Sequence, residues 1–187
     1  MIRPWVIGSV SQNLGTEHDA IVSFAWKTFR EVFPVQVDQF SKIESVERPK
    51  LGELIELKNA SEEFVKRSFA EIIGEEVVPK DWGGERSDLY SNRLTISGNP
   101  ISSAFAFKGP GWKGQEMTMA ALGKKGDQIS RLFSEPAELL VLQHWGTFHR
   151  GVIDYMRAQA NQLHNPRLFM MIDGFTTLTL LRAYGKM

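Results

Sequence analysis

Asp88 and Lys108 have side chains whose types and positions in the chain could act together on a phosphodiester. Hydrolysis of such a bond needs an oxygen-ligated divalent cation to stabilise charge on the phosphate, and a base or a lysine to orient the attacking water. Asp88 opens one strand-like run, 88–97, and Lys108 ends the next, 101–108. Because a short connection predicts an antiparallel hairpin, we expect the two residues to meet at one end of the paired strands.

The position where such a site would hold a second acid is occupied by Ala106. Successive side chains of a strand alternate between its two faces, so Ala104, Ala106 and Lys108 share one face, while Phe105 and Phe107 point to the other. An alanine methyl cannot bind a cation. The two strands therefore predict a metal site that lacks one carboxylate.

The elements that must position these residues follow from the apolar pattern, which predicts an α/β fold with a mixed β-sheet flanked by helices. We treat 1–187 as a single domain, with an N-terminal helical extension over 1–58 and a core over 59–187. Helices are expected at 16–33, from Asn59 or Ser61 to Gly74, from Asp127 onwards and at 148–163. Further strands are expected at 138–143 and 167–172, a short strand and a loop within 35–57, and a strand or helix at 176–184.

One acid, Glu62, falls on the apolar arc of the helix expected between Ser61 and Gly74. Residues placed at 100° steps put Glu62 on the same side as Val65 and Phe69. An acid in the first turn of a helix is also favoured by the helix dipole, without any further role. Both interpretations of Glu62 stay open.

Composition places the chain among ordinary globular proteins. It has no cysteine, which excludes disulfides, thiolate zinc sites and thiol nucleophiles and is compatible with the reducing cytoplasm where we expect it. We see no signal-peptide core and no membrane span in the sequence. The 22 basic and 22 acidic residues balance, although residues 89–187 hold 11 bases and 6 acids, which is compatible with binding a phosphate backbone.

Other sequence motifs argue against several classes of site. The loop 109–114 matches G-x-G-x-x-G, but Pro110 removes a backbone donor and too little chain follows for a dinucleotide-binding fold. The same loop lacks the Lys and Ser or Thr of a phosphate-binding P-loop. The four histidines form no helical ligand pair, which makes a histidine metal site improbable.

Taken together, the motifs between Asn59 and Asp173 resemble the PD-(D/E)xK superfamily of restriction-endonuclease-like nucleases, and most closely its resolvase-like branch. The resemblance depends on a helix bearing an acid, on Gly-Gly-Glu-x-x-Asp88, and on the strand that ends in Lys108-Gly109. It also includes a helix that opens with Gly-Asp-Gln128-Ile-x-Arg131, followed by a strand that closes on Gln143. A restriction-endonuclease-like core is the fold that this resemblance implies.

The resemblance implies roles for individual residues. Asp88 would bind Mg²⁺ or Mn²⁺, Lys108 would position the water, and Glu62 would assist the metal. The missing carboxylate would come from Glu85, Glu116 or Asp127, of which Asp127 is preferred because it stands beside Gln128 at a helix start. Gln128 would shape the catalytic site, and phosphate contacts are expected from four bases: Lys113, Lys124, Lys125 and Arg131.

Three functions remain open at this point. The first is a Mg²⁺-dependent endonuclease that hydrolyses DNA, and it depends on another acid replacing the one that Ala106 lacks. The second is an inactive nuclease-fold protein that binds nucleic acid or a protein partner. The third is a structural or assembly module. Because nucleases of this superfamily often work as dimers, we also expect a homodimer.

Overall fold

The computed structural model describes residues 30–78, 86–110, 115–122 and 127–187. Its centre is a four-stranded sheet with the order β1-β2-β4-β6. β1 and β2 are antiparallel, whereas β2, β4 and β6 run parallel to one another. This mixed sheet flanked by helices confirms the α/β class. The strands are β1 (Leu89–Ile96), β2 (Asn99–Lys108), β4 (Leu139–His144) and β6 (Leu168–Ile172).

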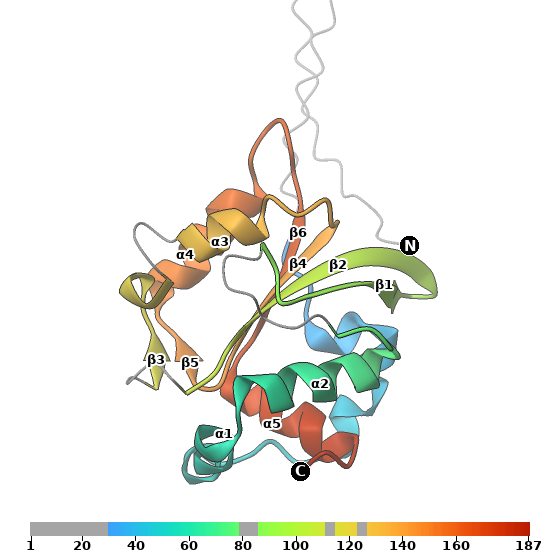
Figure 1. Ribbon diagram of the computed structural model, residues 1–187, viewed down its shortest axis with the longest axis vertical. Coiled ribbons are helices and arrows are strands. Elements are labelled where there is room, and N and C mark those ends of the chain that lie inside the picture. Colours follow the sequence, from blue (N-terminus) through green and yellow to red (C-terminus); the bar gives the residue numbers. More distant parts are fainter. Residues whose placement is uncertain (1–29, 79–85, 111–114, 123–126) are drawn as a thin grey trace, which may run out of the picture.

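Helices cover both faces of the sheet. Figure 1 shows α2 (Glu62–Ile73) and α5 (Gly174–Ala183) on one side, and α3 (Asp127–Leu132) and α4 (Arg150–Ala160) on the other. Alternate side chains of each buried strand therefore enter two different cores. The core on the α2 side contains Phe69, Phe105, Phe107, Val141 and Met170, and the core on the α3 side contains Ala104, Ala106, Ile129, Leu142 and Met156.

The hairpin between β1 and β2 turns through Ser97 and Gly98, which have φ angles of 51° and 76°. Positive φ at both central residues is the conformation that matches the twist of a two-residue hairpin loop. Asp38 supports this turn, because its carboxylate accepts hydrogen bonds from Thr95 Oγ1 at 2.6 Å and from Gly98 N at 2.8 Å. β2 consequently begins at Asn99, two residues before the predicted start of the strand.

α2 begins and ends where its sequence predicts. Ser61 Oγ accepts a hydrogen bond from Phe64 N at 3.0 Å, and Gly74 ends the helix in the left-handed conformation with φ 76°. These are the ordinary caps of a helix, and they fix which residues occupy its first turn. Glu62 is therefore the first residue of α2, next to the end of β2.

The segment before α2 differs from the prediction of a short strand and a loop. It forms 3₁₀ helices and one short α-helix, and it pairs with the sheet only at a single bridge between Val37 and Ile96. It also places Phe40 in the core beside Phe69, with ring centroids 6.0 Å apart. The elements are η1 (Pro34–Gln36), η2 (Asp38–Ser45), η3 (Leu51–Leu54) and α1 (Ile55–Asn59).

The helix predicted over 16–33 lies mostly outside the described residues, and its described end, 30–33, is not helical. There Val32 N donates to Phe169 O, so this piece is extended along β6. The strand or helix predicted at 176–184 is the helix α5. No described helix is both long enough and apolar enough to cross a membrane. The remaining elements are β3 (Glu116–Met117), which pairs with β5 (Thr147–Phe148), and the 3₁₀ helix η4 (Met119–Leu122).

Candidate functional site at the carboxyl end of β2

Asp88 lies immediately before β1 and binds the backbone of β2. Its Oδ2 accepts a hydrogen bond from Phe107 N at 2.6 Å, and its own N–H donates to Phe105 O at 2.8 Å. A carboxylate that accepts from a backbone N–H makes a short, charge-assisted bond. The Asp88 side chain thus takes the place that a strand neighbour would otherwise occupy beside Phe107.

Glu62 makes the corresponding contact two residues further along β2. Its Oε2 accepts a hydrogen bond from Gly109 N at 2.7 Å. A Cβ added to Gly109 would lie 2.9 Å from Glu62 Cβ, so the start of α2 and the end of β2 approach too closely for any side chain at position 109. Gly109 is required here by close packing.

The two carboxylates bind the same edge of β2, on either side of Lys108. Backbone N–H groups at positions i and i+2 of a strand point in the same direction and lie about 7 Å apart. Asp88 and Glu62 therefore come from different elements and gather at one strand end. Both residues were predicted as metal ligands; the structure shows that their carboxylates bind the backbone at this strand end, and the metal role stays a prediction.

Lys108 is half-buried at the end of β2, on the face that α3 and α4 cover. Its carbonyl accepts a hydrogen bond from Trp145 N at 3.2 Å, so the ends of β2 and β4 are held together. Among the described residues we find no ion pair to the Lys108 ammonium. In the chain, Lys108 stands between the two residues whose backbone N–H groups bind Asp88 and Glu62.

Ala106 is buried in the core on the α3 side, with an exposed fraction of 6%. It faces apolar side chains there and supplies no ligand. Within the part of the chain that the structure describes, no group of three or more acids and histidines could hold a metal ion. Among the described residues, Asp88 and Glu62 are the acids shown to bind the backbone at the end of β2.

The acid preferred as the replacement ligand, Asp127, is exposed at the start of α3 and lies 3.2 Å from Arg131 Nε on the same helix. Gln128 Oε1 is buried and has no hydrogen-bond partner in the described chain. Glu116 is exposed on β3. Glu85, Lys113, Lys124 and Lys125 lie outside the described residues, so their predicted roles stay predictions.

Two features of this region were not predicted from the sequence. Lys66 lies one turn after Glu62 on α2 and is almost completely buried, with its Nζ 2.9 Å from Glu63 Oε2. The sequence signal for this lysine was Glu62, an acid four residues earlier on the same helix. A lysine is rarely buried without an acid, and Glu63 supplies one.

The second feature is the pair His144 and Trp145 at the end of β4. His144 is completely buried, its Nδ1 lies 3.2 Å from Lys108 O, and burial lowers the pKa of its imidazole. Trp145 is 7% exposed, and its Nε1 has no acceptor among the described residues. The sequence predicted no role for His144 at this site, and its position beside Lys108 was not foreseen.

A pocket of about 350 Å³ adjoins this strand end. Its lining includes Ile55 and Lys58 of α1, together with Pro110 and Trp145. These residues belong to segments next to the candidate site, because α1 precedes Glu62, Pro110 follows Gly109, and Trp145 N donates to Lys108 O. The pocket and the two carboxylates therefore share one end of the sheet.

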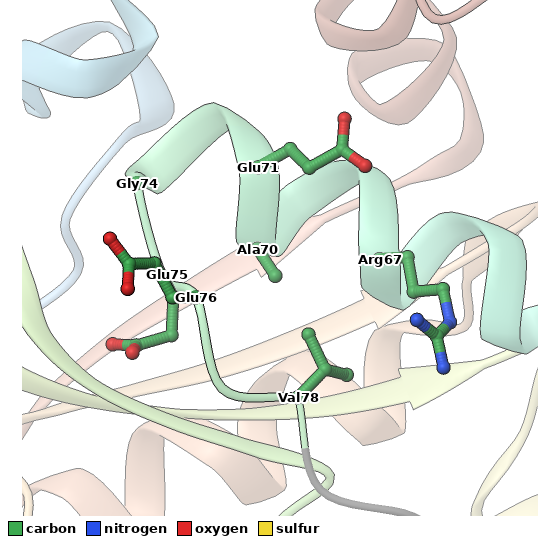
Figure 2. A pocket seen from close by; sticks show the side chains of 7 residues that line it. All are labelled: Arg67, Ala70, Glu71, Gly74, Glu75, Glu76 and Val78. Carbon is green, nitrogen blue, oxygen red and sulfur yellow. The ribbon is translucent and has the colours of Figure 1, made fainter.

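A second pocket, of about 480 Å³, lies at the far end of α2 (Figure 2). Figure 2 shows Glu75 and Glu76 at one end of it and Arg67 at the other. Arg67 Nε binds Glu63 Oε1 at 2.7 Å, and Glu71 pairs with Lys186. No residue predicted for the functional site lines this pocket, so the candidate site is the one at the carboxyl end of β2.

Comparisons of this chain with models of protein families, with characterised proteins and with solved structures gave no match. The resemblance to restriction-endonuclease-like nucleases therefore stays a prediction, supported by the motifs named above.

Proposed function

We propose that this protein is a Mg²⁺-dependent endonuclease that hydrolyses phosphodiester bonds of DNA at the carboxyl end of β2. The observation that supports it is that two carboxylates bind the backbone on either side of Lys108, at the residue before it and the residue after it. Asp88 binds Phe107 N, Glu62 binds Gly109 N, and Lys108 lies between them. Carboxylates and a lysine at one strand end are the residue types that metal-assisted phosphodiester hydrolysis uses.

The donor set suits Mg²⁺ in number and type. Magnesium takes oxygen ligands, and proteins commonly hold it through one or two carboxylates while substrate phosphates and water complete its shell. Asp88 and Glu62 would hold the ion, which supplies positive charge against the developing charge on the phosphate. Lys108 would orient the attacking water and place a further positive charge near the phosphate.

Cleavage of plasmid and branched DNA with Mg²⁺ or Mn²⁺ tests this function. Asp88→Asn, Glu62→Gln and Lys108→Ala should each lower the cleavage rate by about 100-fold or more, because each removes a group acting in the transition state. Asp154→Asn and Lys186→Ala change an acid and a lysine elsewhere and should cleave like the unmodified protein. Unchanged cleavage by Asp88→Asn or Lys108→Ala would exclude this assignment.

A second function shares the site without cleavage. Ala106 is buried in the core, and the described residues contain no group of three or more acids and histidines that could hold a metal ion. Both observations favour a nuclease-fold protein that binds nucleic acid and does not cut it. DNA retention should then fall with salt, as expected when phosphate contacts release counterions, and no divalent cation should support cleavage. Sedimentation of the full chain with and without DNA tests the homodimer expected from the same resemblance.

A further inference from the structure

The peptide group between Lys108 and Gly109 is held from both sides. Its N–H, which belongs to Gly109, donates to Glu62 Oε2 at 2.7 Å. Its carbonyl, which belongs to Lys108, lies 3.2 Å from His144 Nδ1 and accepts from Trp145 N at 3.2 Å. The C=O and N–H of one trans peptide point in opposite directions, so His144 binds the edge of β2 that faces β4, and Glu62 binds the other edge. One planar group therefore connects a buried imidazole to a carboxylate of the proposed site.

The contact with Lys108 assigns the tautomer of His144. A carbonyl oxygen only accepts hydrogen bonds, so the Nδ1 atom that faces Lys108 O carries the proton, and Nε2 keeps its lone pair. Nε2 is buried and makes no hydrogen bond within the described residues. This suits a nitrogen without a proton, because a buried N–H is rarely left unpaired. The Gln115 carbonyl also lies near the ring, where it opposes the lowering of the His144 pKa by burial.

The imidazole of His144 is fixed by its surroundings. The residue is completely buried, and its ring packs against the rings of Trp145 and Phe148, with centroids 5.8 Å and 5.9 Å away. The parallel pairing of β2 with β4 places His144 directly opposite Lys108. β2 ends at Lys108, so the peptide that follows lies outside the strand and depends on such contacts for its orientation. The backbone angles that this orientation sets decide which rotamers are open to the Lys108 side chain.

We propose that His144 is a positioning residue, whose Nδ1–H holds the Lys108 carbonyl and thereby orients the Lys108 side chain and the Glu62 carboxylate. This inference rests on the proposed function and adds to its site a residue that meets neither metal nor DNA. Donors on the carbonyl polarise the peptide and strengthen the bond from Gly109 N to Glu62, because hydrogen bonds in a chain reinforce one another. Loss of the Nδ1 donor therefore loosens a proposed metal ligand and the water-orienting lysine together.

NMR of the full chain tests this chain of hydrogen bonds independently of cleavage. The nitrogen chemical shifts of the His144 ring should identify the tautomer with the proton on Nδ1. The amide proton of Gly109 should resonate downfield, as expected for a donor to a carboxylate, and should move upfield in His144→Leu. His144→Asn places an amide N–H near the position of Nδ1 and should keep the downfield shift. A proton on Nε2, or the same Gly109 shift in both variants, would overturn the proposal.

Cleavage of plasmid DNA with Mg²⁺ measures the effect on the reaction. His144→Leu should lower kcat about 100-fold and leave KM unchanged, because a misplacement of about 1 Å can cost this much and the buried ring does not contact DNA. His144→Asn should recover most of this loss, although Asn fills the buried site less well than Leu, so that a purely structural role predicts the opposite order. The control His164→Leu changes an exposed histidine and should cleave like the unmodified protein. Equal kcat for His144→Leu and His144→Asn would assign the loss to packing and overturn the proposal.

The positioning role and the proposed function fail in different ways. If the unmodified chain cuts no DNA with either Mg²⁺ or Mn²⁺, the endonuclease is excluded, and the catalytic role of His144 is excluded with it. If the unmodified chain cuts DNA and His144→Leu cuts it equally well, the positioning role alone is overturned.

Discussion

Asp88 and Phe107 are joined by a hydrogen bond of 2.6 Å from the backbone N–H of β2 to the carboxylate that precedes β1. One carboxylate oxygen thus completes the pairing of a buried strand at its end. The same side chain is the metal ligand of the proposed endonuclease. A structural role and a proposed chemical role therefore coincide in Asp88, and removal of the whole side chain would abolish both.

Two substitutions at this position do separate the roles. Asp88→Asn keeps an oxygen that can accept from Phe107 N, so its stability should stay close to that of the unmodified protein, while metal-dependent cleavage is lost. Asp88→Ala leaves the N–H of Phe107 without this acceptor and should lower the free energy of unfolding by about 1–3 kcal/mol. Urea denaturation of both variants measures the difference. If Asp88→Asn and Asp88→Ala lowered the free energy of unfolding equally, the oxygen that accepts from Phe107 N would not be what stabilises the fold.

Gly109 should tolerate no side chain, because a Cβ there would lie 2.9 Å from Glu62 Cβ and 3.3 Å from Glu62 Cα. These atoms belong to the first turn of α2 and cannot rotate away. Gly109→Ala should therefore lower the free energy of unfolding by about 1–3 kcal/mol, the usual cost of overpacking. Gly52→Ala, where nothing lies within 4 Å, is the matched control and should change stability by less than about 0.5 kcal/mol. Equal stability of the two variants would contradict the close approach of α2 and β2.

Asp38 should make the hairpin sensitive to acid. Hydrogen bonds from the Thr95 hydroxyl and then from Gly98 N hold the pKa of Asp38 below its ordinary value of 3.8. A carboxyl whose pKa is lowered by folding stabilises the protein fully above 3.8, and this contribution is lost as the pH falls through the folded pKa. Asp38→Ala should consequently lower the melting temperature at neutral pH and do so less as the pH drops below 3.8. A difference that stays constant with pH would contradict this role.

The sequence specified the elements whose signals are local. Asn59 or Ser61 was predicted to begin α2 and Gly74 to end it, and the structure has Ser61 and Gly74 as its caps. The apolar run around Phe105 and Phe107 predicted a strand, which the structure shows as β2. The segment before α2 was misread because 3₁₀ helices have no strong apolar period. Val37 resembles a strand residue, but it makes only one bridge, to Ile96. The structure around Val37 is determined by its contact with the β1–β2 hairpin and not by the residues next to it in the sequence.

The candidate site could be predicted in part for the same reason. Asp88 and Lys108 were predicted from strand ends and from alternation. The structure adds the hydrogen bonds from Phe107 N to Asp88 and from Gly109 N to Glu62. His144 and Trp145 were not connected with Lys108, since only the parallel pairing of β2 with β4 brings position 144 opposite position 108. Pairing between strands distant in sequence leaves no local mark.

The burial of His144 should appear as a loss of stability in mild acid. Burial disfavours the imidazolium and lowers the pKa of His144 below its ordinary value of 6.5. As the pH falls from 6.5 towards the folded pKa, the unfolded chain gains a proton that the folded protein does not, so the free energy of unfolding decreases. One such proton gives a slope of at most about 1.4 kcal/mol per pH unit.

Urea denaturation at a series of pH values measures this slope. His144→Gln removes the titrating group and should flatten the dependence below 6.5, even if the variant is less stable throughout. His164→Gln changes an exposed histidine after α4 and should keep the acid loss of the unmodified protein. An unchanged slope in His144→Gln would assign the acid loss to another group.

Restoring an acid at position 106 tests whether Asp88 can bind a metal. Ala106 is buried among apolar side chains, so Ala106→Glu should lower the free energy of unfolding by about 3 kcal/mol in the absence of metal. If the new carboxylate and Asp88 share a cation, Mn²⁺ should restore part of this loss. A free concentration of 100 times Kd would restore about 2.7 kcal/mol.

Two control variants test whether any rescue by Mn²⁺ comes from a cation shared by two carboxylates. Ala106→Gln has nearly the same size and no charge, so it should be destabilised and Mn²⁺ should not rescue it. The double variant Ala106→Glu with Asp88→Asn removes the second ligand and should also lose the rescue. Melting temperatures with and without Mn²⁺ compare all three proteins. Rescue that persists without the Asp88 carboxylate, or no rescue of Ala106→Glu at saturating Mn²⁺, would count against Asp88 as a metal ligand and favour the protein that binds nucleic acid without cutting it.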